Sequence, residues 1–122
     1  MIYAAVLCLA INIYHEARGE PVIDQIAVAA ITMNRVKDRD YPDSVCEVVN
    51  QPYQFSWTLS KPKINDKKSF KRAKRIAAAY YYGMLKNPVG ARKYFNTKPL
   101  GKRFDTPYKP IKLHKRSKHV YY

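Results

Sequence analysis

The chain has 122 residues, which is enough for one hydrophobic core but not for two. Its composition, 47% hydrophobic and 13% aromatic, excludes a disordered tail and favours a compact fold. The formal net charge of +14 indicates attraction to a polyanion, namely nucleic acid, an anionic membrane surface or an acidic cell-wall polymer, and does not choose among them.

The first predicted helix begins near the N-terminus. Apolar residues recur at helical spacing from Ile2 to Ile13, and the next position on that face is Glu16. Gly19 and Pro21 are expected to end this helix or to bend it sharply. Glu16 is therefore predicted to lie in line with the core rather than on the solvent side.

This apolar N-terminal stretch resembles a signal-peptide core only superficially. It lacks a preceding positive segment and a small-residue cleavage site, and it is too short to span a bilayer. We therefore assign it to the mature domain and expect a protein made in the cytoplasm without an export signal of its own. Cys8 in this stretch is predicted to be a small buried hydrophobe, and a disulfide with Cys46 is the less favoured alternative.

A second helix is predicted over residues 22–36. Its small residues Ala27, Ala29 and Ala30 permit close packing against the first helix. Asn34 ends the apolar stretch, and its amide is expected to bond buried backbone or the bend at Gly19.

Residues 37–68 are predicted to be mostly loops, because three prolines divide them. One or two helical turns are expected over residues 44–50. They are followed by a dense aromatic and polar cluster, "QPYQFSW", at residues 51–57.

The last third of the chain contains one helix and two strand-like runs. The helix is predicted over residues 69–86, with Ser69 as its N-cap and an apolar stripe that ends at Met84. The runs at 91–96 and 118–122 are expected to pair across the intervening loop.

The positive charge is concentrated in this second half. Residues 1–60 hold only four of the 23 Lys and Arg residues but seven of the nine Asp and Glu residues. Most lysines taken singly are equally well explained as ordinary solvated side chains. Taken together, they predict a strongly positive face.

Glu16 is the first candidate for chemistry. Its carboxyl, on an apolar face near a helix end, should be partly desolvated, and desolvation raises the pKa of a carboxyl group. Cleavage of a glycosidic bond needs a glutamic acid that is protonated near neutral pH, because the leaving oxygen must receive a proton. The pattern alone fits equally well a structural glutamate paired with Arg18 or Arg35.

Glu20 is the competing carboxylate. It is either a second acid–base group or a partner for the N-terminus of the helix at 22–36, and we favour the second role. His15 points about 100° away from Glu16 on a helix, so we do not expect the two to cooperate. The three histidines lack the close pairing on one element that is typical of zinc sites, so neither a metal nor a cofactor is predicted.

Aromatic residues are the other signal. They lie in the loop and in the C-terminal strand-like runs: Tyr53, Phe55, Trp57, Tyr94, Phe95, Tyr121 and Tyr122. Phe55 and Phe95 are expected to be core residues. Loop aromatics interleaved with Gln54, Ser56 and Asn96 also suit a sugar groove, where rings stack and amides bind hydroxyls. The same composition suits single-stranded nucleic acid.

Several segments occur in a recognisable order. They are "EARGEP", "QIAVAAITMNRV", "QPYQFSW", "GARKYFN" and "KHVYY". In this order the chain resembles the cell-wall hydrolase family named for the spore-cortex-lytic enzyme, from about Leu9 to Tyr121. The first two segments at this spacing, followed by "QFSW", are the most specific part.

The resemblance implies an α+β, mainly α, lysozyme-like single domain over residues 1–122, with three or more helices and a short C-terminal β-hairpin. It also implies a lytic transglycosylase that cuts peptidoglycan between N-acetylmuramic acid and N-acetylglucosamine. The essential acid of the family matches Glu16, which would protonate the leaving oxygen and then act as base while a 1,6-anhydro ring closes. That chemistry, unlike two-carboxylate glycosidases, does not need a second carboxylate to activate water.

The same resemblance implies the two walls of the substrate groove. One wall would be formed by Gln54, Phe55, Ser56 and Trp57. The opposite wall would be formed by Tyr94, Phe95 and His119.

The chain departs from the family pattern in several places. Asp24 stands where glycine is usual, and Arg92 and Lys93 replace Thr-His-like residues. The stretch 98–117 is unusually basic and lacks the tryptophan often found there. These departures leave the acid untouched and fall mainly on the hairpin side.

Together these observations predict a monomeric, peptidoglycan-degrading enzyme of the single-domain phage-endolysin type, acting on the cell wall after release. Its charge would hold it against anionic wall polymers or a membrane surface.

A hydrolysing muramidase on the same scaffold is the first alternative. A basic nucleic-acid-binding protein ranks far lower because it leaves "EARGEP" unexplained, and no specific nucleic acid is predicted. A third alternative is membrane disruption by the 69–86 helix alone.

Overall fold

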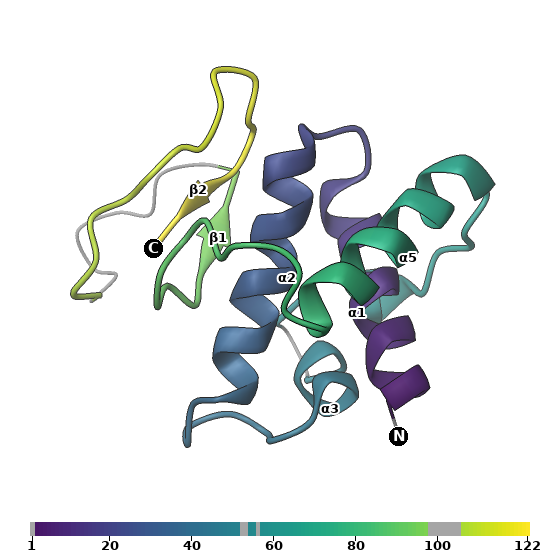
Figure 1. The fold of residues 1–122 in the computed structure, drawn as a ribbon, viewed down its shortest axis with the longest axis horizontal. Helices are drawn as coiled ribbons and strands as arrows, with labels where there is room; N and C mark the ends of the chain where they lie inside the picture. Colours follow the sequence, from purple (N-terminus) through teal and green to yellow (C-terminus); the bar gives the residue numbers. More distant parts are fainter. Residues whose placement is uncertain (1, 52–53, 56, 98–105) are drawn as a thin grey trace.

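The computed structural model describes residues 2–51, 54–55, 57–97 and 106–122, so Tyr53 and Ser56 of the aromatic loop lie outside the described residues. The elements are, in chain order, α1 (Ile2–Ala17), α2 (Val22–Val36), α3 (Val45–Val49), α4 (Trp57–Ser60), α5 (Lys67–Tyr81), β1 (Phe95–Asn96) and β2 (Val120–Tyr121). The fold is α+β and mainly helical, as predicted (Figure 1).

Helices α1 and α2 are joined by a tight turn that reverses the chain. Gly19 adopts a φ of 83° in this turn, a left-handed conformation that glycine accepts without steric cost. Both helices occupy the predicted ranges. Ala29 packs in the same core as α1, but Ala27 and Ala30 pack instead against the C-terminal segment, so only part of the predicted helix contact is made.

A disulfide between Cys8 and Cys46 joins α1 to α3. The expectation of an unpaired Cys8 is therefore wrong. Helix α3 packs against α1 and brings together two cysteines that are 38 residues apart in the sequence. Sequence spacing contains no information about this contact.

The limits of α5 differ from those predicted. Its N-cap is Asp66 rather than Ser69, because the Asp66 carboxylate accepts hydrogen bonds from both the backbone N–H and the hydroxyl of Ser69. The helix ends before Gly83, which adopts a left-handed φ of 78°. Met84 is consequently outside the helix and is 76% exposed rather than part of the apolar stripe.

Strands β1 and β2 pair antiparallel with Phe95 opposite Tyr121, which confirms the predicted hairpin in a shorter form. Tyr121 packs on α2 in one core cluster with Ala27 and Ile31. Figure 1 shows the hairpin on one side of α2 and α5 on the other. Helix α2 therefore separates a helical core from the hairpin layer.

The loop before β1 is held to the end of α2. The side-chain amide of Asn34 donates to the carbonyl oxygens of Gly90 and Arg92, both at 2.7 Å. The amide therefore bonds backbone, as expected, but this backbone is exposed or only partly buried and lies far from the bend at Gly19.

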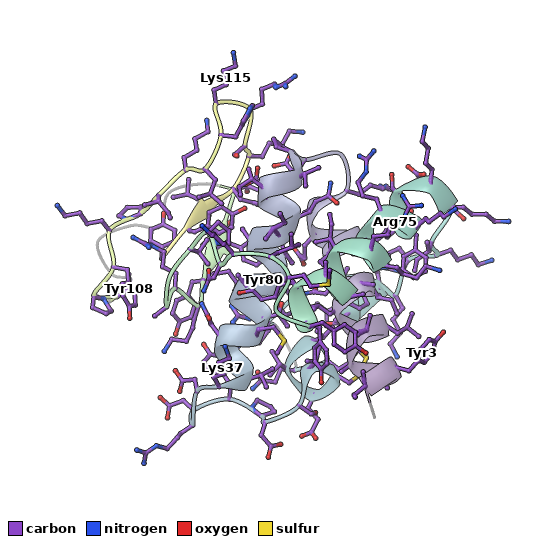
Figure 2. The ribbon with its side chains drawn as sticks, in the orientation of Figure 1. Tyr3, Lys37, Arg75, Tyr80, Tyr108 and Lys115 are labelled. Atoms are coloured by element: carbon purple, nitrogen blue, oxygen red, sulfur yellow. A yellow bond between two sulfur atoms is a disulfide. The ribbon has the colours of Figure 1, made fainter. Side chains whose placement is uncertain are left out.

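The cations of α5 are exposed and point away from the core. They are Lys67, Lys68, Lys71, Arg72, Lys74 and Arg75. Figure 2 shows Arg75 on this helix and Lys115 pointing outward from the C-terminal segment. Among the described residues the only ion pair joins Lys93 to Asp38. Among the described residues, no helix is long and apolar enough to cross a membrane.

Candidate active site

A cleft of about 450 Å³ lies where the end of α1 meets α4 and the hairpin. Among the described residues it is lined by Glu16, Arg35, Gln54, Phe55, Leu59, Phe95, Asn96, Thr97 and His119. The first helix thus contributes a carboxyl, the second a guanidinium, and the hairpin region an aromatic and amide wall.

Glu16 lies in the last turn of α1, in line with the buried residues Leu9 and Ile13. Burial raises the pKa of Glu16 to about 7, although the positive charge of Arg35 acts in the opposite direction. Within the described part of the chain, no ion pair joins Glu16 to Arg18 or to Arg35. Arg18 instead donates to the Tyr14 hydroxyl, so the carboxyl remains available to a ligand.

Arg35 is held beside this acid by aromatic rings and one backbone bond. Its guanidinium carbon lies 5.1 Å from the ring centre of Phe55, 5.5 Å from that of Tyr41 and 5.7 Å from that of Tyr94. Its Nε donates to the carbonyl oxygen of Lys93 at 2.7 Å. Its Nη1 is buried and has no hydrogen-bond partner among the described residues, which leaves a donor in the cleft wall.

The hairpin wall is built from aromatic rings in tilted and edge-to-face contact. The ring centre of Phe95 lies 6.2 Å from that of Phe55 and 5.0 Å from that of His119. Phe55 is buried, as expected, and Phe95 is half-buried. Burial lowers the pKa of His119, so its imidazole is neutral near pH 7, and its Nδ1 has no partner among the described residues.

Asp24 fixes the position of His119. This carboxylate is fully buried in α2 and accepts hydrogen bonds from the hydroxyls of Ser117 and Tyr121, each at 2.5 Å. The two donors flank His119 in the sequence, so both ends of this wall are attached to α2. Sequence reasoning noted the unusual Asp24 but missed its role. A lone acid within an apolar helix, together with hydroxyl residues near the C-terminus, is the pattern that could have indicated this contact.

Glu20 does not line the cleft. Its carboxylate accepts a hydrogen bond from the backbone N–H of Lys118 at 2.8 Å, and α2 has no side-chain cap. The favoured pairing with the N-terminus of α2 is therefore wrong, because the C-terminal segment passes close enough to take this acceptor. Glu20 is a second attachment point for the segment that carries His119.

Trp57 and Tyr94, predicted for the two walls, lie outside the cleft lining. The Trp57 indole N–H donates to the Asn12 side-chain oxygen at 2.8 Å, which turns the ring toward α1. Tyr94 lies against Arg35. Gln54, Phe55, Phe95 and His119 do line the cleft, whereas Ser56 lies outside the described residues. Their role in substrate binding stays a prediction.

Sequence reasoning missed three lining residues. Leu59 and Thr97 carried no recognisable signal, and Arg35 was considered only as a structural partner of Glu16.

No group of three His, Cys, Asp or Glu side chains in the described ranges is arranged to hold a metal ion.

The sequence match decides the family. Residues 19–122 match the model of the family described as Cell Wall Hydrolase. The chain belongs to the cell wall hydrolase family. The matched span begins after Glu16, so the match does not itself assign a role to that carboxyl.

Two spore cortex-lytic enzymes resemble a short part of this chain. The spore cortex-lytic enzyme of Halalkalibacterium halodurans is 46% identical over 44 residues, which is 36% of this chain and 13% of that enzyme. The spore cortex-lytic enzyme of Bacillus subtilis is 44% identical over 48 residues, 39% of this chain and 16% of that enzyme. The match therefore spans only a small part of the length of these relatives.

Two solved structures resemble nearly the whole fold. The catalytic domain of the Bacillus cereus SleB protein has a TM-score of 0.72 and 25% identity, covering 96% of this chain and 88% of that domain. The catalytic domain of the germination-specific lytic transglycosylase SleB from Bacillus anthracis has a TM-score of 0.71 and 26% identity, covering 96% and 92%. The predicted family and the lysozyme-like, mainly helical fold are thereby confirmed.

Proposed function

We propose that this domain degrades peptidoglycan as a lytic transglycosylase, cleaving the glycosidic bond between N-acetylmuramic acid and N-acetylglucosamine. The observation that carries the proposal is the carboxyl of Glu16, which lines a cleft and has a pKa raised by burial to about 7. The family supports a cell-wall substrate, and one structural relative is itself a lytic transglycosylase.

Glu16 acts twice in the proposed reaction. Its protonated carboxyl donates a proton to the glycosidic oxygen as the bond from that oxygen to the muramic acid C1 breaks. The resulting carboxylate then takes the proton of the muramic acid 6-hydroxyl while the oxygen of that hydroxyl bonds to C1. The sugar ends as a 1,6-anhydro ring, and the carboxyl is again protonated. A pKa near 7 suits both steps, since neither protonation state is strongly disfavoured.

The cleft favours this outcome over hydrolysis. Two-carboxylate glycosidases place their acid and their second carboxyl roughly 5–9.5 Å apart across the sugar. Glu16 is the only Asp or Glu among the described residues that line the cleft. A hydrolysing muramidase on the same scaffold remains the alternative, and its products distinguish it.

Two polar atoms of the wall that lack a hydrogen-bond partner among the described residues are proposed to hold the sugar. Nη1 of Arg35 is a donor, and Nδ1 of His119 is a buried polar atom without a partner in the described part of the protein. Buried polar groups are normally satisfied, so both fit oxygen or N–H groups of a bound glycan. Phe95 offers an aromatic surface beside His119.

Digestion of purified sacculi tests the proposal. Wild-type protein is expected to release fragments with 1,6-anhydro ends, identified by mass spectrometry, and Glu16→Gln should lose about 10²–10⁴-fold in rate. Glu47→Gln, at an exposed position of α3, is the matched control for loss of one carboxylate. Wild-type activity in Glu16→Gln would contradict the proposed role of Glu16. Products with reducing ends and no anhydro ring would favour the hydrolysing muramidase.

We further propose that residues 1–122 act as one monomeric catalytic domain held by its positive charge on anionic wall polymers. The exposed cations of α5 support the electrostatic part. Binding to isolated walls should then weaken steeply with added salt. Salt-independent binding, or a dimer in gel filtration, would contradict this part without affecting the role of Glu16.

A further inference from the structure

A second hollow, of about 620 Å³, lies beside the cleft and shares two elements with it. Helix α1 contributes Glu16 to the cleft and the preceding His15 to the hollow. Helix α4 contributes Leu59 to the cleft and Trp57 to the hollow. The short helix α4 is therefore a ridge between two adjoining depressions, and a branched ligand could occupy both at once.

The floor of the hollow is a fixed aromatic platform. The rings of Trp57 and His15 are stacked, with centres 4.6 Å apart and planes at 29°. The indole N–H is anchored to Asn12 at 2.8 Å, and the Asn12 amide donates in turn to the buried Thr32 hydroxyl at 3.2 Å. Ile64 adds apolar surface beside the rings. A platform fixed in this way binds small apolar groups without first having to be ordered.

The rim of the hollow is cationic. Lys61 and Lys63 are exposed and lie among its lining residues, and neither forms an ion pair with an acid in the described part of the chain. Lys61 has a left-handed φ of 47° where its backbone N–H bonds the Trp57 carbonyl at the end of α4. Glycine would adopt this conformation without strain, so the position carries a cation at some conformational cost.

We propose that this hollow binds the acidic stem peptide that branches from the glycan strand in the cleft. The inference rests on peptidoglycan being the substrate. A stem peptide combines small apolar side chains with free carboxylates, which match an apolar floor and a rim of two unpaired lysines. Because the peptide branches from the muramic acid residue, a strand bound beside Glu16 would direct it across α4 toward the Trp57 platform.

Cleavage rates on two matched substrates test the proposal. They are soluble glycan strands carrying uncross-linked tetrapeptides, and the same strands stripped of peptide by an amidase. Lys61→Ala combined with Lys63→Ala should lower kcat/KM on the peptide-bearing strands by about tenfold and leave the stripped strands unaffected. Lys112→Ala combined with Lys115→Ala removes the same charge from exposed positions of the C-terminal segment and should not change the ratio of the two rates. Equal losses on both substrates, or no loss, would overturn the proposal.

A binding measurement tests the hollow independently of catalysis. Trp57 is the only tryptophan in the chain, so its fluorescence reports on the platform alone. Free tetrapeptide should change this fluorescence saturably, and the same peptide with amidated carboxyls should bind at least about tenfold more weakly. The lysine double variant should show the same weakening. Equal affinity for both peptides, or no saturable change, would reject the hollow as a peptide site even if the enzyme cleaves glycan. Conversely, an inactive enzyme with intact peptide binding would reject only the proposed reaction.

Discussion

Burial of Glu16 has a consequence for stability that can be measured without substrate. The pKa of this carboxyl rises from 4.5 to about 7 in the folded protein. One pKa unit corresponds to about 1.36 kcal/mol, so the ionised carboxylate costs the folded state about 3 kcal/mol. The folded state holds the proton more tightly than the unfolded state. The folded protein therefore keeps this contribution to stability in full below about pH 4.5 and loses it, about 3 kcal/mol, as the pH rises to about 7. Glutamine has nearly the same shape and cannot ionise, so Glu16→Gln should escape the loss.

Urea unfolding of both proteins at about pH 4 and about pH 8 measures the effect. The unfolding free energy of Glu16→Gln relative to wild type should increase by about 3 kcal/mol between the two pH values. Titration of every other group is common to both proteins and cancels in this comparison. Glu47→Gln, exposed on α3, controls for removal of one negative charge from a basic chain. A difference between Glu16→Gln and wild type that is the same at both pH values would refute the assignment of Glu16 as a buried, proton-holding acid.

Two further predictions concern the scaffold. Replacing Cys8 and Cys46 by alanine should lower the unfolding free energy by about 4 kcal/mol, because a cross-link between residues 38 apart restricts the unfolded chain. Reductant should destabilise wild type by a similar amount and leave the alanine variant unchanged, and equal stability with and without reductant would contradict the pairing. Asp24→Asn should cost about 2 kcal/mol, because the carboxylate accepts two buried hydroxyl donors, and Ser117→Ala should cost less. Urea unfolding measures both, and a neutral Asp24→Asn would show that these bonds do not hold the hairpin.

Parts of the site follow from local sequence. The helical spacing of apolar residues in α1 places Glu16 on the buried face, since the helical period fixes which residues share a side. The limits of α2 were predictable because Pro21 marks its start and apolar residues recur at helical spacing as far as Val36. Two short runs of strand-forming residues were enough to predict the hairpin, although not its exact length.

The remainder depends on which elements meet. The Cys8–Cys46 bond requires α3 to pack on α1, and the orientation of Trp57 is set by the Asn12 acceptor on another helix. The family resemblance assigned Trp57 to a wall of the cleft, yet its hydrogen bond to Asn12 directs the ring to the adjoining hollow. The role of Asp24 needs the C-terminal segment, more than ninety residues later, to return to α2. Local periodicity contains none of these long-range contacts.

Helix α1 is attached to the rest of the molecule at three successive positions that precede Glu16 in the helix. Cys8 is covalently bonded to α3, Asn12 bonds both α2 and the Trp57 ring, and the Tyr14 hydroxyl accepts the backbone N–H at the start of α5. The helix therefore cannot slide or rotate without breaking contacts to four other elements. The proposed proton donor, Glu16, is therefore preorganised, and a glycan that entered the cleft would meet a carboxyl already in position and would spend none of its binding energy on ordering the acid.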